Sequence, residues 1–139
     1  MKYYKEKLEI KPILTIVSSG IVASFHDVTG RKILITPTLN MLAKKGCKCD
    51  VCGVEGDHFK MIKSNKLEKK LHLFNKNGTR MTIDHHVPRC AGGKSVQDNY
   101  VPLCSTCNGI WKTKFDQIER DNIDFKEGII NLTKGDIVK

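Results

Sequence analysis

Two cysteine pairs with the same spacing constrain the fold of this chain more than any other feature. Cys49 and Cys52 form the first pair, and Cys104 and Cys107 form the second after a long insert. Two intervening residues let both thiolates of a pair face one ion at tetrahedral angles, an arrangement that suits Zn²⁺. One pair alone would also fit a redox motif, whereas two pairs together predict a structural zinc site. Four thiolates would leave this zinc no open position for catalysis.

The other two cysteines, Cys47 and Cys90, lie outside both pairs. Cys47 is an alternative to Cys49, but four residues separate it from Cys52 and this spacing is looser, so Cys49 is preferred. The first residues lack the apolar run and the small-residue cleavage site of a signal peptide. We therefore expect a cytoplasmic protein, in which paired cysteines bind metal more often than they form disulfides.

Size and charge narrow the class of partner. The chain has 139 residues, which predicts one compact domain, and its net charge is +9. The basic excess lies within residues 1–120 and favours a polyanionic partner such as nucleic acid. No stretch approaches the roughly 20 consecutive apolar residues of a membrane span, so no membrane partner is expected.

Runs of β-branched residues near the N-terminus predict a small antiparallel sheet. These runs span residues 13–17, 21–25 and 32–36. Thr36 and Pro37 then predict the start of a short helix over 38–45, which Gly46 ends. Residues 1–11 are predicted to form a solvated arm or an edge element.

Beyond the first cysteine pair, the pattern predicts a β-hairpin around Asn77 and Gly78, then a third strand and a helix. The predicted ranges are 71–74 and 79–83 for the hairpin, 100–103 for the strand and 105–118 for the helix. Residues 56–70 receive no assignment, and residues 121–139 carry no chemical signature.

The stretch from Met81 to Lys114 combines residues that fit a hydrolytic site. Asp84 and His85, at the end of a predicted strand, put a hard oxygen ligand beside a group that titrates near pH 7. Asn108 follows the second cysteine pair and offers a side-chain oxygen. Zinc binding and strand pairing would bring Asn108 near Asp84, which predicts a phosphodiesterase site with one metal ion.

The same stretch resembles the motif of the HNH endonucleases, which belong to the His-Me finger superfamily. The matching residues are Asp84, His85, Val87, Pro88, Gly92, Gly93, Asn99, Leu103, Cys104, Cys107, Asn108 and Lys112. The resemblance covers residues 47–115, and it is specific because these residues agree in order and in spacing beside an independent zinc site. It implies a ββα-metal core of two strands and one helix.

The resemblance also implies roles for individual residues. His85 would be the general base that takes a proton from the attacking water. Asp84 and Asn108 would hold one catalytic Mg²⁺ or Mn²⁺ on the scissile phosphate, and Asn99 would orient the loop and hence His85. Asn108 stands where histidine is commoner in the family, which favours a metal that prefers oxygen ligands.

Two adjacent histidines leave a choice of base. In the family the base lies three residues before a proline, and Pro88 selects His85 by that spacing. Strand alternation would turn the ring of His86 to the opposite side, where it would contact a phosphate, pack, or orient its neighbour.

Three basic residues near the motif are candidate contacts to nucleic acid. Arg89 follows the proline of the catalytic loop. Lys112 and Lys114 belong to the predicted helix, for which the alternative is a solvated helix face. Trp111, beside Lys112, is expected to pack in the core.

The sequence therefore predicts an α+β protein in three segments. Residues 1–46 form a β-rich extension with a short helix, residues 47–120 form the HNH core with its structural zinc site, and residues 121–139 form a tail. The predicted function is metal-dependent hydrolysis of DNA phosphodiester bonds, by nicking or by double-strand cleavage. The alternative is a non-catalytic, zinc-stapled module that binds nucleic acid.

Duplex DNA is the predicted partner, and RNA is the alternative because a backbone-directed site reads phosphates rather than bases. A monomer would nick one strand, whereas a homodimer would cut both. Small proteins of this family resemble nucleases encoded by phages or mobile elements, which implies action in the cytoplasm of a host cell.

Overall fold

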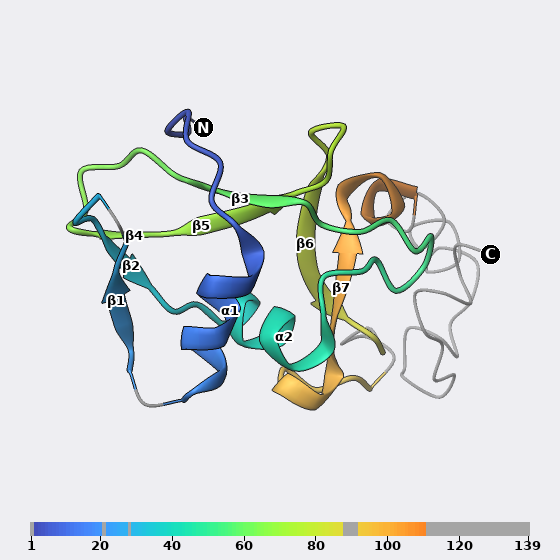
Figure 1. Cartoon of the computed structure of the whole chain (residues 1–139). Coiled ribbons are helices and arrows are strands. Elements are labelled where there is room, and N and C mark those ends of the chain that lie inside the picture. The colour runs from blue at the N-terminus through green and yellow to red at the C-terminus, as the bar shows by residue number, and fades with distance from the viewer. Residues whose placement is uncertain (1, 21, 28, 88–91, 111–139) are drawn as a thin grey trace.

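The computed structural model of the chain describes residues 2–20, 22–27, 29–87 and 92–110. These residues form an α+β fold with two small sheets and short helices, in which α1 and α2 pack against each other (Figure 1). The predicted α+β class and its cysteine-containing core are confirmed. Within the described residues, no helix is long and apolar enough to cross a membrane.

The first helix, α1 (Ile10–Ser18), replaces the strand predicted over 13–17, so that prediction was wrong. Ile13 and Val17 lie four residues apart, on one face of the helix, and both are buried. This face packs against the second helix, α2. Helical spacing of the apolar residues, together with the packing it allows, outweighs the β-propensity of the branched side chains.

The predicted N-terminal antiparallel sheet is confirmed in part. Strands β1 (Ser24–His26) and β2 (Lys32–Leu34) pair antiparallel, with Phe25 opposite Ile33. Strand β4 (Glu68–Lys69) adds a parallel neighbour to β2, which makes a three-stranded sheet.

Helix α2 (Pro37–Lys45) forms where its end signals predict it. The Thr36 hydroxyl accepts a hydrogen bond from the amide of Leu39 at 3.3 Å, and this bond caps the N-terminus. Gly46 ends the helix with a φ of 90°, a conformation that glycine adopts without steric cost. The predicted start and stop of this helix are confirmed.

A second, antiparallel sheet has four strands in the order β3-β5-β6-β7. The strands are β3 (His58–Met61), β5 (Leu71–Phe74), β6 (Arg80–His85) and β7 (Tyr100–Cys104). The predicted hairpin and third strand correspond to β5, β6 and β7 and are confirmed. Tyr3 and Leu8 form isolated antiparallel bridges beside β3, so the N-terminal residues form an edge element of this sheet.

One hydrophobic cluster joins the helices to the four-stranded sheet. Its fully buried side chains are Phe59, Ile33, Leu39, Met41, Leu42, Leu73 and Leu103. Helix α2 also contacts β6 and β7 directly. The first 46 residues therefore contribute to the core that positions the β6–β7 hairpin, while the division of the chain into three segments stays a prediction.

A helix begins at Ser105, directly after β7, as predicted. The hairpin and the first turns of this helix form the predicted ββα unit. The remainder of the predicted helix and the tail at 121–139 lie outside the described residues.

Candidate active site

The β6–β7 hairpin carries the zinc-ligand candidate Cys104 at one end and the Asp84–His85 pair toward the other. Its antiparallel register pairs Met81 with Cys104 at one end and His85 with Tyr100 at the other. The Thr82 hydroxyl donates to the carbonyl oxygen of Leu103 at 2.6 Å and adds a tie across the strands. This register places Cys104 and the Asp84–His85 pair at different levels of one hairpin.

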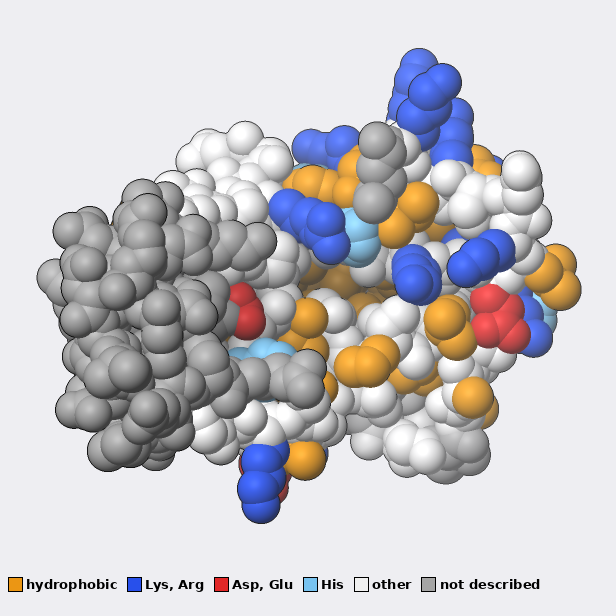
Figure 2. Space-filling view, turned by 180° about the vertical axis from the view of Figure 1, so that it is seen from behind, with side chains coloured by type: hydrophobic (Ala, Val, Ile, Leu, Met, Phe, Trp, Pro, Cys, Tyr) orange, Lys and Arg blue, Asp and Glu red, His pale blue; other side chains and the backbone are white. Residues whose placement is uncertain are grey.

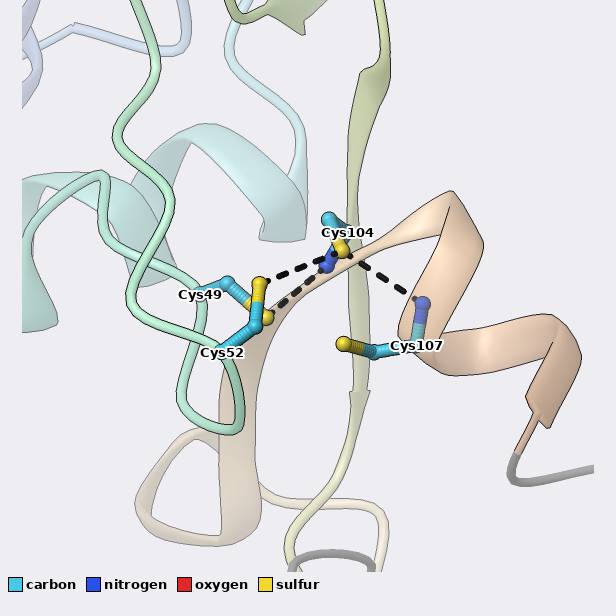
Figure 3. A group of neighbouring side chains, drawn as sticks. All are labelled: Cys49, Cys52, Cys104 and Cys107. Atoms are coloured by element: carbon cyan, nitrogen blue, oxygen red, sulfur yellow. Dashed lines mark hydrogen bonds between the residues drawn. The ribbon is translucent and has the colours of Figure 1, made fainter. Parts of the chain in front are cut away.

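The four predicted cysteines converge on one point (Figure 3). Cys49 and Cys52 come from the loop after α2, Cys104 ends β7, and Cys107 lies on the first turn of the following helix. Their sulfur atoms all lie within 4.8 Å of one another. The predicted four-cysteine cluster is therefore confirmed.

The spacing of the sulfurs suits a single tetrahedral ion. A zinc–sulfur bond of about 2.3 Å in tetrahedral geometry places neighbouring sulfurs about 3.8 Å apart. The Sγ atoms of Cys52 and Cys104 are 3.7 Å apart. The amide of Cys104 donates to Sγ of Cys49 at 3.3 Å, and the amide of Cys107 donates to Sγ of Cys104 at 3.4 Å. Such amide bonds orient thiolates and stabilise their charge.

Cys49 and Cys47 differ in the pKa of their thiols. Burial and the Glu55 carboxylate raise the pKa of Cys47 to about 11. Burial also acts to raise the pKa of Cys49, but backbone hydrogen bonds, led by that of Cys104, outweigh it and lower the pKa to about 7. Cys47 is not part of the cluster. The preference for Cys49 is supported, while Cys90 lies outside the described residues.

The two cysteines of the second pair, Cys104 and Cys107, do not ionise readily in the absence of a cation. Burial raises the pKa of both Cys104 and Cys107, and for each of them the charge of the neighbouring Cys49 acts in the same direction. Without a cation these two cysteines therefore remain protonated, and a bound cation would be needed to hold them as thiolates. The donor set, four sulfurs without oxygen or nitrogen, is typical of a structural site.

Asp84 and His85 lie together near the opposite end of the hairpin. Oδ1 of Asp84 accepts the amide of His85 at 2.8 Å and lies 3.8 Å from Nδ1 of the same histidine. On the other side of the ring, Nε2 is 2.9 Å from the hydroxyl of Ser95. The ring of Tyr100 contacts the imidazole edge to face, with centroids 5.4 Å apart. These contacts hold the imidazole in one orientation.

A groove of about 520 Å³ opens beside this pair. Its walls come from the start of α2, from β5 and β6, and from Tyr100 of β7, and both Asp84 and His85 line it. On this side of the molecule, lysine and arginine side chains gather around a hollow (Figure 2). The pair is therefore only partly exposed and borders a basic surface.

His86 faces a different environment from His85. Its Nδ1 lies 3.5 Å from Oδ2 of Asp50, which belongs to the loop between the first two cysteines. Its amide donates to the carbonyl oxygen of Asn99 at 2.7 Å. His86 is not part of the groove lining, so the two histidines project to different surroundings, as strand alternation predicts.

Asn99 closes the loop that connects β6 to β7. It ends the short 3₁₀ helix η2 (Gln97–Asn99), and its Oδ1 accepts the amide of Val87 at 2.9 Å. Its Nδ2 donates to the carbonyl oxygens of Val87 at 3.0 Å and Lys94 at 2.9 Å. A Cβ atom on Gly93 would overlap the Val87 carbonyl, so only glycine fits at position 93, where the backbone passes close to Val87.

Asn108 has an unusual environment for an amide side chain. Its Oδ1 is buried and has no hydrogen-bond partner. An orphaned buried oxygen of this kind is a candidate ligand atom, because leaving it unpaired is costly. The other predicted contacts, Arg89, Lys112 and Lys114, lie outside the described residues, as do Pro88 and Trp111.

Sequence reasoning missed two residues that support this end of the hairpin. Ser95 contacts His85 from a polar loop in which no spacing distinguishes it from its neighbours. Nζ of Lys45 donates to the carbonyl oxygens of Asp98 and Tyr100, although the sequence marks Lys45 only as a last-turn lysine of α2. Both contacts depend on tertiary placement, which no local pattern records.

Comparison with known proteins adds an independent finding. A family model described as HNH endonuclease matches residues 47–113. No curated protein and no solved structure matches the chain. The matched span contains all four cysteines of the cluster together with Asp84, His85, Asn99 and Asn108. Residues 47–113 of this chain are therefore an HNH endonuclease domain.

Proposed function

We propose that this protein is an endonuclease that hydrolyses phosphodiester bonds of DNA with the help of one divalent metal ion. The observation that carries the proposal is the Asp84–His85 pair at a groove with basic surroundings, inside an HNH endonuclease domain. A carboxylate beside an imidazole supplies a metal ligand and a base in one place. The net charge of +9 favours a phosphate-rich partner.

His85 is the general base of the proposed reaction. It takes a proton from a water molecule while the water oxygen attacks phosphorus, and the bond from phosphorus to the 3′ oxygen breaks. The 3′ oxygen takes up a proton from solvent, so the products are a 5′ phosphate and a 3′ hydroxyl. The Nε2 contact to Ser95 supports a tautomer in which Nε2–H donates to the serine oxygen. The basic lone pair then lies on Nδ1, next to Asp84.

Asp84 and Asn108 are the proposed ligands of a catalytic Mg²⁺ or Mn²⁺. The buried, unpartnered Oδ1 of Asn108 supports this assignment, because a hard cation is a fitting partner for an amide oxygen. When bound, the ion neutralises negative charge that develops on the scissile phosphate and on the leaving oxygen.

The cysteine cluster has a structural role in this proposal and holds Zn²⁺. Four thiolates complete the coordination of zinc, so no position is left for water or substrate. The site joins the loop of Cys49 and Cys52 to the end of β7 and to the following helix. Asn108 directly follows Cys107, and zinc binding therefore fixes the turn that carries the proposed ligand.

Asn99 is a positioning residue in the proposed site. Its three side-chain hydrogen bonds hold the backbone of Val87 and Lys94, and its carbonyl oxygen accepts the amide of His86, next to His85. Arg89, Lys112 and Lys114 remain proposed contacts to the phosphate backbone.

The experiment that tests the function is cleavage of supercoiled plasmid with added Mg²⁺ or Mn²⁺. The protein should nick or linearise the plasmid, and His85→Ala should reduce the rate by a factor of about 10²–10⁴ while retaining DNA binding. His26→Ala is the matched control, because His26 is an exposed histidine of β1 outside the groove, and it should leave the rate unchanged.

Absence of cleavage by the unsubstituted protein with either metal would contradict the proposal, as would equal cleavage by His85→Ala. Retained DNA binding without cleavage would favour the non-catalytic module. A matched RNA duplex in the same assay tests the choice of DNA over RNA.

A further inference from the structure

Arg80 lines the same groove as Asp84 and His85, although the proposed hydrolysis does not use it. It begins β6, and Asp84 follows four residues later on that strand. Side chains four residues apart on a strand share a face of the sheet. At about 3.3 Å per residue, about 13 Å of strand separates the two. Arg80 therefore belongs to the same surface as the candidate active site but stands apart from it.

Arg80 lacks a counter-ion within the described part of the chain. The ion pairs there involve two lysines and three histidines, and none includes Arg80. Its side chain is partly buried, and its Nε is buried without a hydrogen-bond partner. A cation held in a confined place is normally paired, because burial of an unpaired charge is costly. This end of the groove consequently presents positive charge that an external anion would neutralise.

His72 and Tyr3 hold the guanidinium of Arg80 in place. Nη2 of Arg80 lies 3.2 Å from Nε2 of His72, and Nδ1 of His72 lies 2.6 Å from the hydroxyl of Tyr3. A guanidinium only donates, so Nε2 of His72 is the acceptor and its Nδ1–H donates to the tyrosine oxygen. Burial, together with the charges of Arg80 and Lys70, lowers the pKa of His72 to about 4. The ring is therefore neutral near pH 7, as the contact with Arg80 requires.

Lys70 adds a second cation to the groove, away from Arg80 along β5. It is exposed, lines the groove and directly precedes β5, the strand that carries His72. Phe74 of β5 pairs with Arg80. Lys70 precedes Phe74 by four residues and so stands farther along the groove, toward the Asp84–His85 pair. The groove thus has Arg80 toward one end and the Asp84–His85 pair toward the other. A linear polyanion that lies along the groove would meet both ends at once.

We propose that Arg80 binds a backbone phosphate of the strand that is cut, a few nucleotides from the scissile phosphate. The inference rests on the proposed function for the position of the scissile phosphate near His85. Successive phosphates of one DNA strand advance about 3.4 Å along the helix axis, so about 13 Å corresponds to at most about four nucleotides. The planar guanidinium matches two phosphate oxygens and is held in orientation by His72.

The first test measures binding to a short fluorescent DNA duplex by anisotropy at several salt concentrations, in a His85→Ala background that does not cut. Arg80→Ala should weaken binding about tenfold and lower the slope of log affinity against log salt by about one. Lys76→Ala is the control of equal charge change, since Lys76 lies in the β5–β6 turn outside this groove, and it should change affinity less than about twofold.

Equal affinities and equal salt slopes for Arg80→Ala and Lys76→Ala would overturn the inference. Arg80→Gln keeps most of the side-chain length without the charge, and it provides the same comparison if the alanine variant does not fold. Arg80→Lys should restore the salt slope without restoring the full affinity, because an ammonium does not reproduce the planar contact.

A second test addresses His72 as the residue that positions Arg80. His72→Gln retains an acceptor atom for the guanidinium, whereas His72→Leu removes it. The glutamine variant should bind DNA within about threefold of the parent, and the leucine variant should weaken binding toward the level of Arg80→Ala. Equal binding by both variants would show that His72 does not orient Arg80.

The endonuclease proposal and the phosphate-site proposal can fail independently of each other. If the unsubstituted protein cleaves plasmid but Arg80→Ala binds DNA like the lysine control, only the phosphate site is overturned. If Arg80→Ala lowers binding but no metal supports cleavage, the phosphate site stands as a contact to nucleic acid and the endonuclease proposal fails.

Discussion

The two ends of the β6–β7 hairpin are held by different kinds of interaction. At the Cys104 end, four sulfur atoms from two distant segments lie within 4.8 Å of one another. At the Tyr100 end, the Asn99 side chain makes three hydrogen bonds within the loop that joins the strands. One end gathers four potential metal ligands, whereas the other is held by the hydrogen bonds of a single amide.

The two kinds of interaction organise different parts of the molecule. A tetrahedral ion can join segments that are far apart in sequence, and at this cluster it would join the loop of Cys49 and Cys52 to the helix of Cys107. The Asn99 amide, by contrast, bonds the backbone of Val87 and Lys94, which lie close to it in sequence. Failure of the first should affect the fold of the domain, and failure of the second should affect mainly the candidate active site.

The largest expected effect follows from removal of one sulfur ligand. Structural zinc contributes about 10–16 kcal/mol of binding free energy, which is comparable to the entire stability of a typical domain, about 5–15 kcal/mol. Cys104→Ser should therefore abolish cooperative unfolding of the domain and reduce the zinc content well below one ion per chain. Circular dichroism melts and metal analysis of the purified protein measure both quantities.

Cys47→Ser is the matched control for this substitution. Cys47 lies two residues before Cys49 but outside the cluster, so its loss should leave zinc content and the melting transition unchanged. A drop in zinc content for Cys47→Ser as large as for Cys104→Ser would contradict the assignment of the four ligands.

The same contrast explains how far the sequence alone could predict the structure. The cysteine pairs, the Asp84–His85 dipeptide and the caps of α2 are local patterns, and their meaning depends on a few neighbouring residues. The structure brings the four cysteines together and starts and ends α2 as these patterns predict. Where an interaction is encoded by spacing, the sequence is sufficient.

The helix over residues 13–17 could not be predicted from the local sequence, and the reason is physical. Their β-branched side chains favour a strand, and only packing of Ile13 and Val17 against α2 selects the helix. Strand β3 was likewise missed, because it lies in a basic, irregular segment and the alternation of Phe59 and Met61 covers only four residues. Both elements are determined by partners that are remote in sequence.

The Arg80–His72–Tyr3 contact shows the same limit within the groove. Its members come from the N-terminal edge element, from β5 and from β6, so no motif contains them. Lys45 and Ser95 reach the loop and His85 in the same way, from separate elements. A motif reveals the residues that carry the chemistry, whereas the residues that orient them emerge only with the fold.

An intermediate effect is expected at the Tyr100 end. Asn99→Ala removes three hydrogen bonds and leaves the amide of Val87 and two carbonyl oxygens unpaired, which costs about 1–3 kcal/mol in local stability. The zinc content should not change, but plasmid cleavage should fall by a factor of about ten or more, because the loop beside His85 loses its support.

Asn65→Ala is a suitable comparison, since Asn65 is an exposed asparagine near β4 and distant in sequence from this loop. Its cleavage rate should equal that of the parent protein. Loss of zinc from Asn99→Ala would show that the two ends of the hairpin are not independent.

The smallest effect is expected for the contact that links the two ends. Nδ1 of His86 lies 3.5 Å from Oδ2 of Asp50, and both side chains are substantially exposed, at 45% and 40%. Exposed pairs of this kind contribute about 0–1 kcal/mol, because water screens the charges and the side chains lose freedom. His86→Ala should therefore lower the free energy of unfolding by less than about 1 kcal/mol and change cleavage by less than about threefold.

A double-mutant cycle of His86→Ala with Asp50→Ala, measured by denaturant unfolding, gives the coupling energy between the two side chains directly. A coupling above about 2 kcal/mol would mean that the cysteine loop supports the catalytic loop through this pair. A coupling energy near zero would mean that the cysteine cluster and His85 are connected through the β6–β7 hairpin and not through this pair.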